Sequence, residues 1–303
     1  MKPRGGTEIL VDGLNKHVDV NKYDVNIIPS ICHPDILKKD KKNIVWQHQS
    51  YDQEVVVNMQ SKNFTESVDA FVYVSDWQYE AYRQRFLHTF QNGYVIKNAI
   101  EPIEYQKRQK QEKIKIAYTS TPWRGLDILT SVVKLLDRDD IEVDVYSSNK
   151  IYGDQFYEFE GRKYDYLLDN VENTKGMNLF GYTTNQEVKD ALKDVNIFAY
   201  PSTFAETSCL SMIEAAAAGC SIVSVNLGAL PETSLGFGKL VPVQKTRELM
   251  VEKYAEALNK SIDEYWENKV QDKLKFQSDR FNDYYSWDTR KHEWVEFLDK
   301  ITA

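Results

Sequence analysis

The chain has 303 residues, of which 42% are hydrophobic and 13% aromatic; it can bury a sizeable core, and it is longer than one average domain requires. Acidic residues outnumber basic ones by 46 to 38, which gives a net charge of −8. Such a field repels a phosphate backbone and argues against a nucleic-acid partner. Any phosphate-bearing ligand must therefore be small and held in a local pocket.

The cysteines and the apolar stretches indicate which cellular compartment the protein occupies. Cys32, Cys209 and Cys220 are too few for a disulfide framework and lack the paired spacing of a zinc site. No stretch approaches the roughly 20 apolar residues of a membrane-spanning helix, and the N-terminus lacks the apolar core of a signal peptide. We therefore expect a soluble protein of the cytoplasm.

Short β-branched runs alternate with helical patterns, which favours an α/β fold with parallel sheets covered by helices on both faces. The first third predicts strands at 25–28, 43–46, 70–74 and 94–96, and helices at 7–16 and 77–86. Between Glu101 and Lys113 the apolar content falls, as is typical of a linker. We therefore predict a first domain at 1–101 and a linker at 102–113.

A second α/β series occupies the rest of the chain and predicts a domain at 114–286. Its expected strands are 114–118, 142–146, 177–179, 197–200 and 221–225, and its expected helices are 126–136, 186–192, 209–218 and 246–266. The polar, aromatic segment 152–174 has no clear period and is expected to be an excursion on one face. An amphipathic helix at 287–301 follows. Two consecutive α/β domains leave a cleft between them.

The most informative stretch, 201–220, leaves a strand, crosses a polar loop and enters an Ala-rich helix. Ser208 is the expected N-cap of this helix and Gly219 its expected end. The amides of Ser208, Cys209 and Leu210 would then lie at the C-terminal edge of the sheet. Such amides, together with the helix dipole, can hold a phosphate.

Two glutamates accompany this predicted phosphate site. Glu206 lies in the loop and Glu214 in the helix, with seven residues between them, which places them some 80° apart in helical projection. Carboxylates beside a phosphate are costly unless they accept hydrogen bonds from hydroxyls, which a sugar and a ribose supply. The pattern indicates a sugar nucleotide, although an N-capped core helix with one glutamate at its solvent edge explains the spacing equally well.

Here the sequence resembles the retaining glycosyltransferases of family 4, which have the two-domain GT-B fold. Their pattern of Glu, seven residues, Glu, Ala-rich helix, Gly, strand and Gly-x-x-Pro-Glu loop is matched in order by Glu206, Glu214, Gly219 and Gly228-Ala-Leu-Pro-Glu232. The stretches 98–101, 119–126 and 178–182 extend the resemblance. The motif sequences at 46–49, 75–78, 120–125 and 204–209 are most similar to those of a poorly characterised bacterial and viral branch of the family.

The resemblance implies two Rossmann-like domains that face each other across a cleft: an acceptor-side domain at 1–101, on which the C-terminal helix 287–301 packs back, and a domain at 114–286 that binds the nucleotide sugar. It also implies roles for individual residues. Glu206 would contact the donor sugar, Glu214 the ribose hydroxyls, and Arg124 the diphosphate, whose departing charge a guanidinium can stabilise in a fork. Family members usually have a second basic residue a few positions before this arginine, but the stretch Tyr118-Thr-Ser-Thr contains none. The remaining donor-binding candidates are Thr119, Ser120, Gly125, Thr207, Ser208, Cys209 and Leu210.

The first domain supplies the opposite side of the expected cleft. His48 follows the strand 43–46, where the family has a histidine that faces the donor sugar. Gly5 and Gly6 resemble the family's glycine-rich loop near the reaction centre, where close backbone approach requires residues without Cβ. The family has a strand before this loop, whereas only four residues precede Gly5. The first domain is therefore expected to be shortened by one strand.

Together these implications predict a retaining, metal-independent hexosyltransferase that uses a nucleotide diphosphate sugar, no cofactor, and a glycan or lipid-linked acceptor. The alternatives are an inactive nucleotide-sugar or glycan-binding protein, and an epimerase or phosphorylase on the same fold. A basic cluster predicts either a solvated loop or a weak peripheral membrane contact. It consists of Lys38, Lys39, Lys41 and Lys42.

Overall fold

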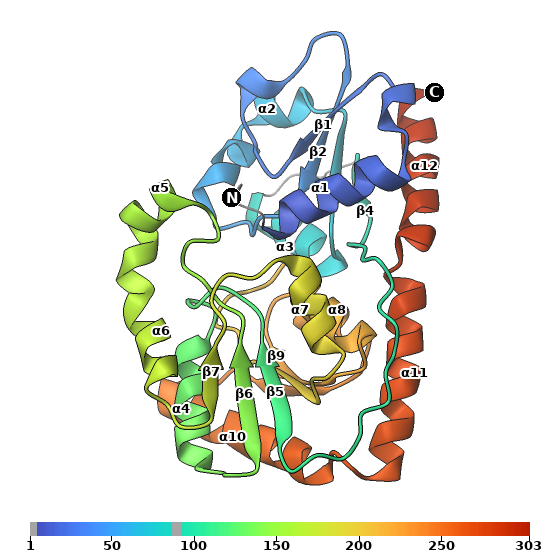
Figure 1. Ribbon diagram of the computed structural model, residues 1–303. Helices are drawn as coiled ribbons and strands as arrows, with labels where there is room; N and C mark the ends of the chain where they lie inside the picture. Colours follow the sequence, from blue (N-terminus) through green and yellow to red (C-terminus); the bar gives the residue numbers. More distant parts are fainter. Residues whose placement is uncertain (1–4, 87–91) are drawn as a thin grey trace.

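The computed structural model describes residues 5–86 and 92–303, and its strands form two separate parallel sheets (Figure 1). This confirms the predicted α/β fold. The first sheet has the order β1-β2-β3-β4. Its strands are β1 (Val25–Pro29), β2 (Lys42–Gln47), β3 (Ala70–Tyr73) and β4 (Gly93–Val95), and its helices are α1 (Gly6–His17), α2 (Lys62–Glu66) and α3 (Asp76–Phe86), with 3₁₀ turns at Val20–Lys22, Pro34–Ile36 and Glu54–Gln60.

Both faces of the first sheet are buried, because alternate residues of a strand point to opposite sides. In β2, Ile44 and Trp46 pack against one hydrophobic core and Val45 against another. The first of these cores includes residues of α1 and of the C-terminal helix α12 (Trp287–Thr302). In the part of the chain that the structure describes, α1 is the first element and no strand precedes it; the four residues before Gly5 lie outside that part.

The second sheet has the order β10-β9-β8-β5-β6-β7. Its strands are β5 (Ile114–Tyr118), β6 (Ile141–Val145), β7 (Met177–Leu179), β8 (Ile197–Tyr200), β9 (Ser221–Asn226) and β10 (Lys239–Pro242). Its helices are α4 (Leu126–Leu136), α5 (Asp154–Phe156), α6 (Asp165–Glu172), α7 (Asn185–Leu192), α8 (Leu210–Ala217), α9 (Leu230–Thr233), α10 (Arg247–Glu264) and α11 (Asn268–Tyr284). The strand order reverses between β5 and β8, and ligands of open α/β sheets bind at such a switch point.

The chain crosses between the two sheets twice. The segment 102–113 has no helix or strand, but it is anchored, because the buried Arg108 donates to the carbonyl oxygens of Val195 (3.1 Å) and Leu192 (2.9 Å). The second crossing leads from α11 to α12, which lies beside the first sheet (Figure 1). Trp294 of α12 packs edge-on against Trp46 with the ring centroids 4.8 Å apart.

Six of the named helices and strands were not predicted from the sequence, namely α2, α5, α6, α9, α11 and β10. β10 is short, and α6 lies in the segment 152–174, which has no clear period. α11 escapes the apolar pattern because part of its buried face is polar: Gln277 donates to the carbonyl of Cys220 at 2.8 Å, and Ser278 donates to that of Ala217. Across the described residues, no helix is both long and apolar enough to cross a membrane.

Candidate active site

A cleft of about 1150 Å³ lies between the two sheets and is lined by loops from both. The loop after β5 and the loop after β8 form one wall, at the point where the strand order of the second sheet reverses. The start of α1 and the residues after β2 form the opposite wall. Of the sequence-predicted site residues, those on the cleft are Gly5, Gly6, His48, Thr119, Ser120, Arg124, Glu206, Thr207, Ser208, Cys209, Leu210 and Glu214.

Gly125 is the one predicted residue that does not line the cleft, so its predicted contact with the donor is not supported. It has φ +96°, and a Cβ on it would lie 2.0 Å from the carbonyl oxygen of Pro201. Only glycine fits this combination of a left-handed backbone and a close approach. Gly125 therefore positions the loop that carries Arg124.

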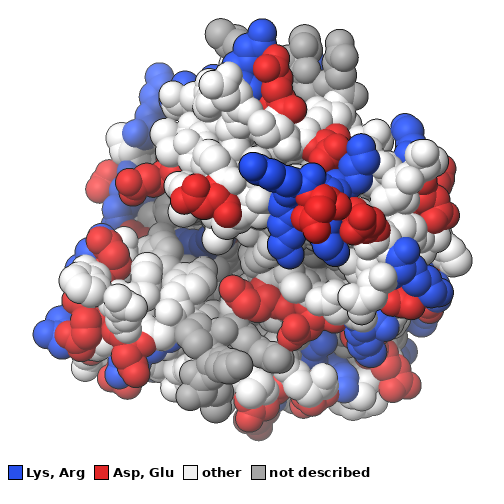
Figure 2. All heavy atoms as spheres, turned by 90° about the horizontal axis from the view of Figure 1, so that it is seen from above, with Lys and Arg blue, Asp and Glu red and all other residues white. Residues whose placement is uncertain are grey.

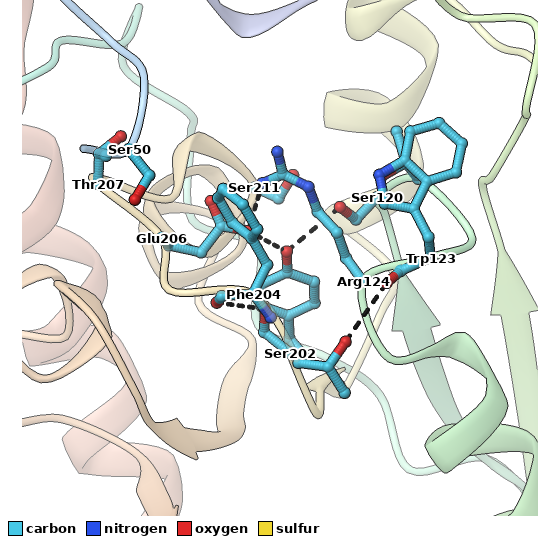
Figure 3. A network of polar contacts seen from close by, with 12 residues as sticks. Ser50, Ser120, Trp123, Arg124, Ser202, Phe204, Glu206, Thr207 and Ser211 are labelled. Atoms are coloured by element: carbon cyan, nitrogen blue, oxygen red, sulfur yellow. Dashed lines mark hydrogen bonds and ion pairs between the residues drawn. The ribbon is translucent and has the colours of Figure 1, made fainter. Parts of the chain in front are cut away.

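An ion pair occupies the centre of the second-sheet wall (Figure 3). Nη1 of Arg124 lies 2.5 Å from Oε1 of Glu206, and the hydroxyl of Tyr200 donates to the same oxygen at 2.5 Å. The Arg124 guanidinium lies 4.4 Å from the ring centroid of Phe204. The two residues expected to meet separate parts of a ligand are thus bonded to each other.

The pair is strongly shielded from solvent: the Glu206 side chain is 7% exposed and that of Arg124 23%. Burial alone would lower the pKa of Arg124, but Glu206 beside it raises that pKa well above its usual range. Burial and then the charge of Glu206 raise the pKa of Tyr200, so its phenol remains a donor. Within the described part of the chain, Arg124 is the only lysine or arginine on the cleft.

The N-terminus of α8 faces the same cleft. Its N-cap is Cys209 and not Ser208, so that expectation was wrong by one residue. Gly219, with φ +84°, follows the last turn as predicted, and its amide donates to the carbonyl of Ala216 at 3.0 Å. The hydroxyl of Ser211 donates to the carbonyl of Thr119 at 2.6 Å, which ties α8 to the loop after β5.

Glu214 is buried within α8, and Nδ2 of Asn185 donates to both of its oxygens at 2.9 and 3.1 Å. Burial raises the pKa of Glu214, since the Asn185 amide only partly offsets the cost of a buried charge. Asn185 was not among the predicted site residues. The only signal near it is the matched stretch 178–182, which ends shortly before α7.

His48 lies just after the end of β2, and its backbone carbonyl accepts a hydrogen bond from the Thr207 hydroxyl at 2.8 Å. This bond joins the two walls. Burial lowers the pKa of His48 to about 3, so the ring is neutral at physiological pH. Among the described residues, no partner bonds four buried polar atoms of the cleft, namely His48 Nε2, Asn98 Oδ1, Thr119 Oγ1 and Thr121 Oγ1. Buried polar atoms without partners are costly, and a polar ligand would satisfy them.

Comparison with known proteins agrees with this geometry. The sequence profile described as "Glycosyl transferases group 1" matches residues 98–279, more than half of the chain. The chain belongs to this family. A comparison with curated proteins finds no match.

Three solved structures illustrate the shared GT-B fold. A variant of S. aureus TarM in complex with fondaparinux, α-GlcNAc-glycerol and UDP has TM-score 0.61 and 17% identity, with 86% of this chain and 51% of that chain covered. The pneumococcal O-GlcNAc transferase GtfA with UDP and GlcNAc has TM-score 0.67 and 12% identity, covering 97% and 60%. A glycosyltransferase from Rickettsia africae has TM-score 0.70 and 13% identity, covering 99% and 83%. This chain therefore spans only about half to three fifths of the first two.

In this member of the family, the loop Gly228-Ala-Leu-Pro-Glu232 supports the site from behind. Gly228 has φ +60°, a Cβ on it would lie 2.7 Å from the backbone of Glu206, and the amide of Ala229 donates to the Glu206 carbonyl at 2.7 Å. Glu232 points away from the cleft. It accepts hydrogen bonds from the amides of Asp76 and Trp77 at the start of α3, each at 2.9 Å, and it pairs with Lys97.

The basic cluster of the first sheet is partly neutralised. Lys41 lies 3.6 Å from Asp24, and Lys42 lies 3.2 Å from Asp69. On the face seen in Figure 2, basic and acidic side chains are interspersed. Membrane contact through Lys38 and Lys39, both exposed, stays a prediction.

The substitution Glu214→Gln is expected to stabilise the protein at neutral pH. Because burial raises the pKa of Glu214, the folded state binds its proton more tightly than the unfolded state does. Stability is therefore lost as pH rises from the usual carboxyl range through the raised pKa, and glutamine removes this loss. Thermal melts at pH 5 and pH 8 should show a gain for the variant of about 2 °C or more at pH 8 and a smaller one at pH 5. A variant less stable than the wild type at both pH values would contradict this reading.

Proposed function

We propose that the chain is a retaining glycosyltransferase of family 4 that transfers a sugar from a nucleotide diphosphate donor to an acceptor hydroxyl without a metal ion. The observation that carries the proposal is the meeting of Arg124, Glu206 and the N-terminus of α8 on one wall of the cleft. UDP is the proposed donor nucleotide, because both TarM and GtfA have UDP in their complexes.

In the proposed complex the diphosphate lies against the amides at Ser208, Cys209 and Leu210, where the helix dipole favours negative charge. Glu214 accepts hydrogen bonds from the ribose hydroxyls. The sugar lies between Glu206 and His48, whose neutral ring can donate or accept one hydrogen bond but adds no charge.

The bond from the anomeric carbon to the diphosphate oxygen breaks while the acceptor oxygen forms a bond to the same carbon from the same face. The acceptor proton passes to the departing diphosphate, so that the products are the glycoside and the free nucleotide diphosphate. Arg124 and the helix amides stabilise the negative charge that develops on the leaving group.

A second candidate is a protein that binds a nucleotide sugar or a glycan without turnover. The observation that favours it is the pairing of Arg124 with Glu206, because it neutralises the single described cation of the cleft. An epimerase would instead convert the donor without an acceptor, and a phosphorylase would require inorganic phosphate.

The test is a thermal-shift screen with UDP, GDP, ADP, CMP and dTDP sugars, followed by measurement of nucleotide release. A donor that binds only the folded state raises its melting temperature by mass action. We expect a shift with a UDP sugar that is lost in Glu214→Ala and kept in the control Glu256→Ala, which changes an exposed residue of α10. Retention is then read from the anomeric configuration of the product by NMR. No shift with any donor would refute the proposal, and a shift without release would favour the second candidate.

A further inference from the structure

Four aromatic rings form one end of the cleft wall, and the proposed donor site does not use them. Trp123 precedes Arg124 in the loop after β5, and the other three come from the excursion that follows β6. The Trp123 ring centroid lies 6.3 Å from that of Tyr152, 5.7 Å from that of Phe156 and 4.9 Å from that of Tyr164. We call Trp123, Tyr152, Phe156 and Tyr164 the aromatic wall.

The aromatic wall is open to the cleft and is not part of a hydrophobic core. All four rings line the cleft, and Tyr152 is 43% exposed. The short helix α5, which ends in Phe156, extends from the second sheet toward the first (Figure 1). Aromatic faces left exposed in a cleft lose the stabilisation of burial, which is typical of a surface that binds a ligand.

The wall lies between the reaction centre and the first sheet. Trp123 stands beside Arg124 (Figure 3). The ring of Tyr152 lies near that of Trp123, with the centroids 6.3 Å apart. On the other side, a Cβ on Gly5 would lie 3.3 Å from Cε1 of Tyr152. Glu214, which is predicted to hold the ribose, and its hydrogen-bond partner Asn185 belong instead to α8 and α7.

Carboxylates and amides also line the cleft. Glu8 of α1 accepts a hydrogen bond from the amide of Gly5, which lies against Tyr152, and Glu160 of the excursion pairs with Lys163. Gln49 and Gln53 supply amides, and Arg124, the only lysine or arginine among the described cleft residues, is paired with Glu206. This lining favours hydroxyl groups, which donate to carboxylate and amide oxygens, over a further anionic group.

We propose that the aromatic wall binds a sugar ring of a neutral glycan, and that this glycan is the acceptor. A pyranose has an apolar face of C–H groups, which packs on an aromatic ring. Its hydroxyls lie around the edge of the ring and donate hydrogen bonds to the carboxylate and amide oxygens. The acceptor role of the glycan rests on the proposed function, but the binding of a neutral glycan at these rings can be tested without turnover.

The experiment measures binding of the full chain to a printed array of neutral, sialylated and sulfated glycans, and to phosphatidylglycerol vesicles. The strongest array ligand is then titrated by NMR, and UDP is titrated by calorimetry in parallel. The variants are Tyr152→Ala, Phe156→Ala and the conservative Tyr152→Phe. Phe159→Ala is the matched control, because Phe159 lies in the same excursion but is 80% exposed and does not line the cleft.

We expect neutral glycans to be preferred, and each alanine variant of the wall to weaken their binding about tenfold. Tyr152→Phe and the control should stay within about twofold of the wild type. No binding of any neutral glycan, preference for acidic glycans or vesicles, or an equal loss in Phe159→Ala would overturn the inference. So would a loss of UDP binding in Phe156→Ala that matches the loss of glycan binding, because the wall would then hold the nucleobase.

The failure of the proposed function has a different outcome. If the wild type binds no nucleotide sugar but binds neutral glycans through the aromatic wall, the glycosyltransferase proposal fails and the glycan site stands.

Discussion

Replacing Arg124 with alanine is expected to lower sugar transfer about 10²- to 10³-fold, which is the usual cost of removing one group that stabilises charge in a transition state. It should also destabilise the fold. Glu206, with a side chain only 7% exposed, would keep its charge without its cationic partner. Breaking a buried pair in this way costs about 3 kcal/mol or more; the 23% exposure of Arg124 places the expectation at this low end.

A second substitution separates the two effects. In Arg124→Ala combined with Glu206→Gln, the unpaired charge is gone, while the glutamine oxygen can still accept the hydrogen bond from Tyr200. We expect the melting temperature to return most of the way to the wild-type value and transfer to remain lost. The control is Arg138→Ala, which breaks ion pairs with Asp140 and Asp263; both carboxylates are about half exposed and remain solvated, so stability should change by about 1 kcal/mol or less. Full turnover in Arg124→Ala would rule out the proposed role of this residue.

The ion pair also bears on how a donor would bind. The Arg124 guanidinium has five N–H donors, and its bond to Glu206 uses Nη1. A donor diphosphate can bind the edge formed by Nε and Nη2 while the ion pair stays intact, or it can replace Glu206, whose carboxylate then accepts hydrogen bonds from the hydroxyls of the transferred sugar. In both arrangements Arg124 and Glu206 each keep a partner, which limits the desolvation cost of the two shielded charges.

The parts of this site that the sequence predicts are those set by local pattern. The spacing of Glu206 and Glu214 and the stop at Gly219 depend on residues within one loop and one helix, and all three lie where the pattern indicates. Ser208 fails as the N-cap because tertiary contacts set the start of α8. Thr207 is bonded to the His48 carbonyl across the cleft, and the helix begins one residue later than its sequence suggests.

The parts that the sequence does not predict are joined over long separations. The aromatic wall brings Trp123 together with rings of a segment that has no period of its own. The buried face of α11 includes Gln277 and Ser278, which bond to carbonyls of another helix end, so it carries no clear apolar stripe. Neither arrangement leaves a signal in a short window of residues, because the partner that explains it is far away in the chain.

Glu232 is the clearest example of a residue whose role depends on a distant partner. It ends the Gly-x-x-Pro-Glu stretch of the second sheet, yet its carboxylate accepts hydrogen bonds from the amides of Asp76 and Trp77, at the start of α3 beside the first sheet. A carboxylate at this position also interacts favourably with the helix dipole. Lys97 also takes part, since its amine pairs with both Glu232 and Asp76. We call this contact between Glu232, Lys97 and the start of α3 the tie.

The ion pair of Lys97 with Asp76 remains charged over a wide pH range. Burial alone would lower the pKa of Lys97, but its hydrogen bonds to Asp76 and Glu232 raise it, while Lys97 lowers the pKa of Asp76. The stabilisation from this pair is therefore lost as the pH rises through the raised pKa of Lys97 or falls through the lowered pKa of Asp76.

Glu232→Ala is expected to destabilise the chain by about 2 to 3 kcal/mol, because two amides of α3 lose a charged acceptor and Lys97 loses one of its two partners. In a chain of this size the melting temperature should fall by about 5 °C. Glu232→Gln is the matched comparison, since its amide oxygen can still accept from one backbone N–H, and it should lose only part of this stability. Differential scanning calorimetry provides the measurement.

Calorimetry also tests what the tie does. If Glu232 holds the two sheets together, the alanine variant should unfold in two steps or over a broader range than the wild type, because each core then melts more independently. Transfer should fall as well, since Thr207 and His48 meet across the same gap and the two walls of the cleft depend on their alignment. A single sharp transition at the wild-type temperature would show that Glu232 only caps α3, and that the Thr207 hydroxyl, the bridge at Ile100 and Ser286, and the packing of α12 are sufficient to hold the two sheets in place.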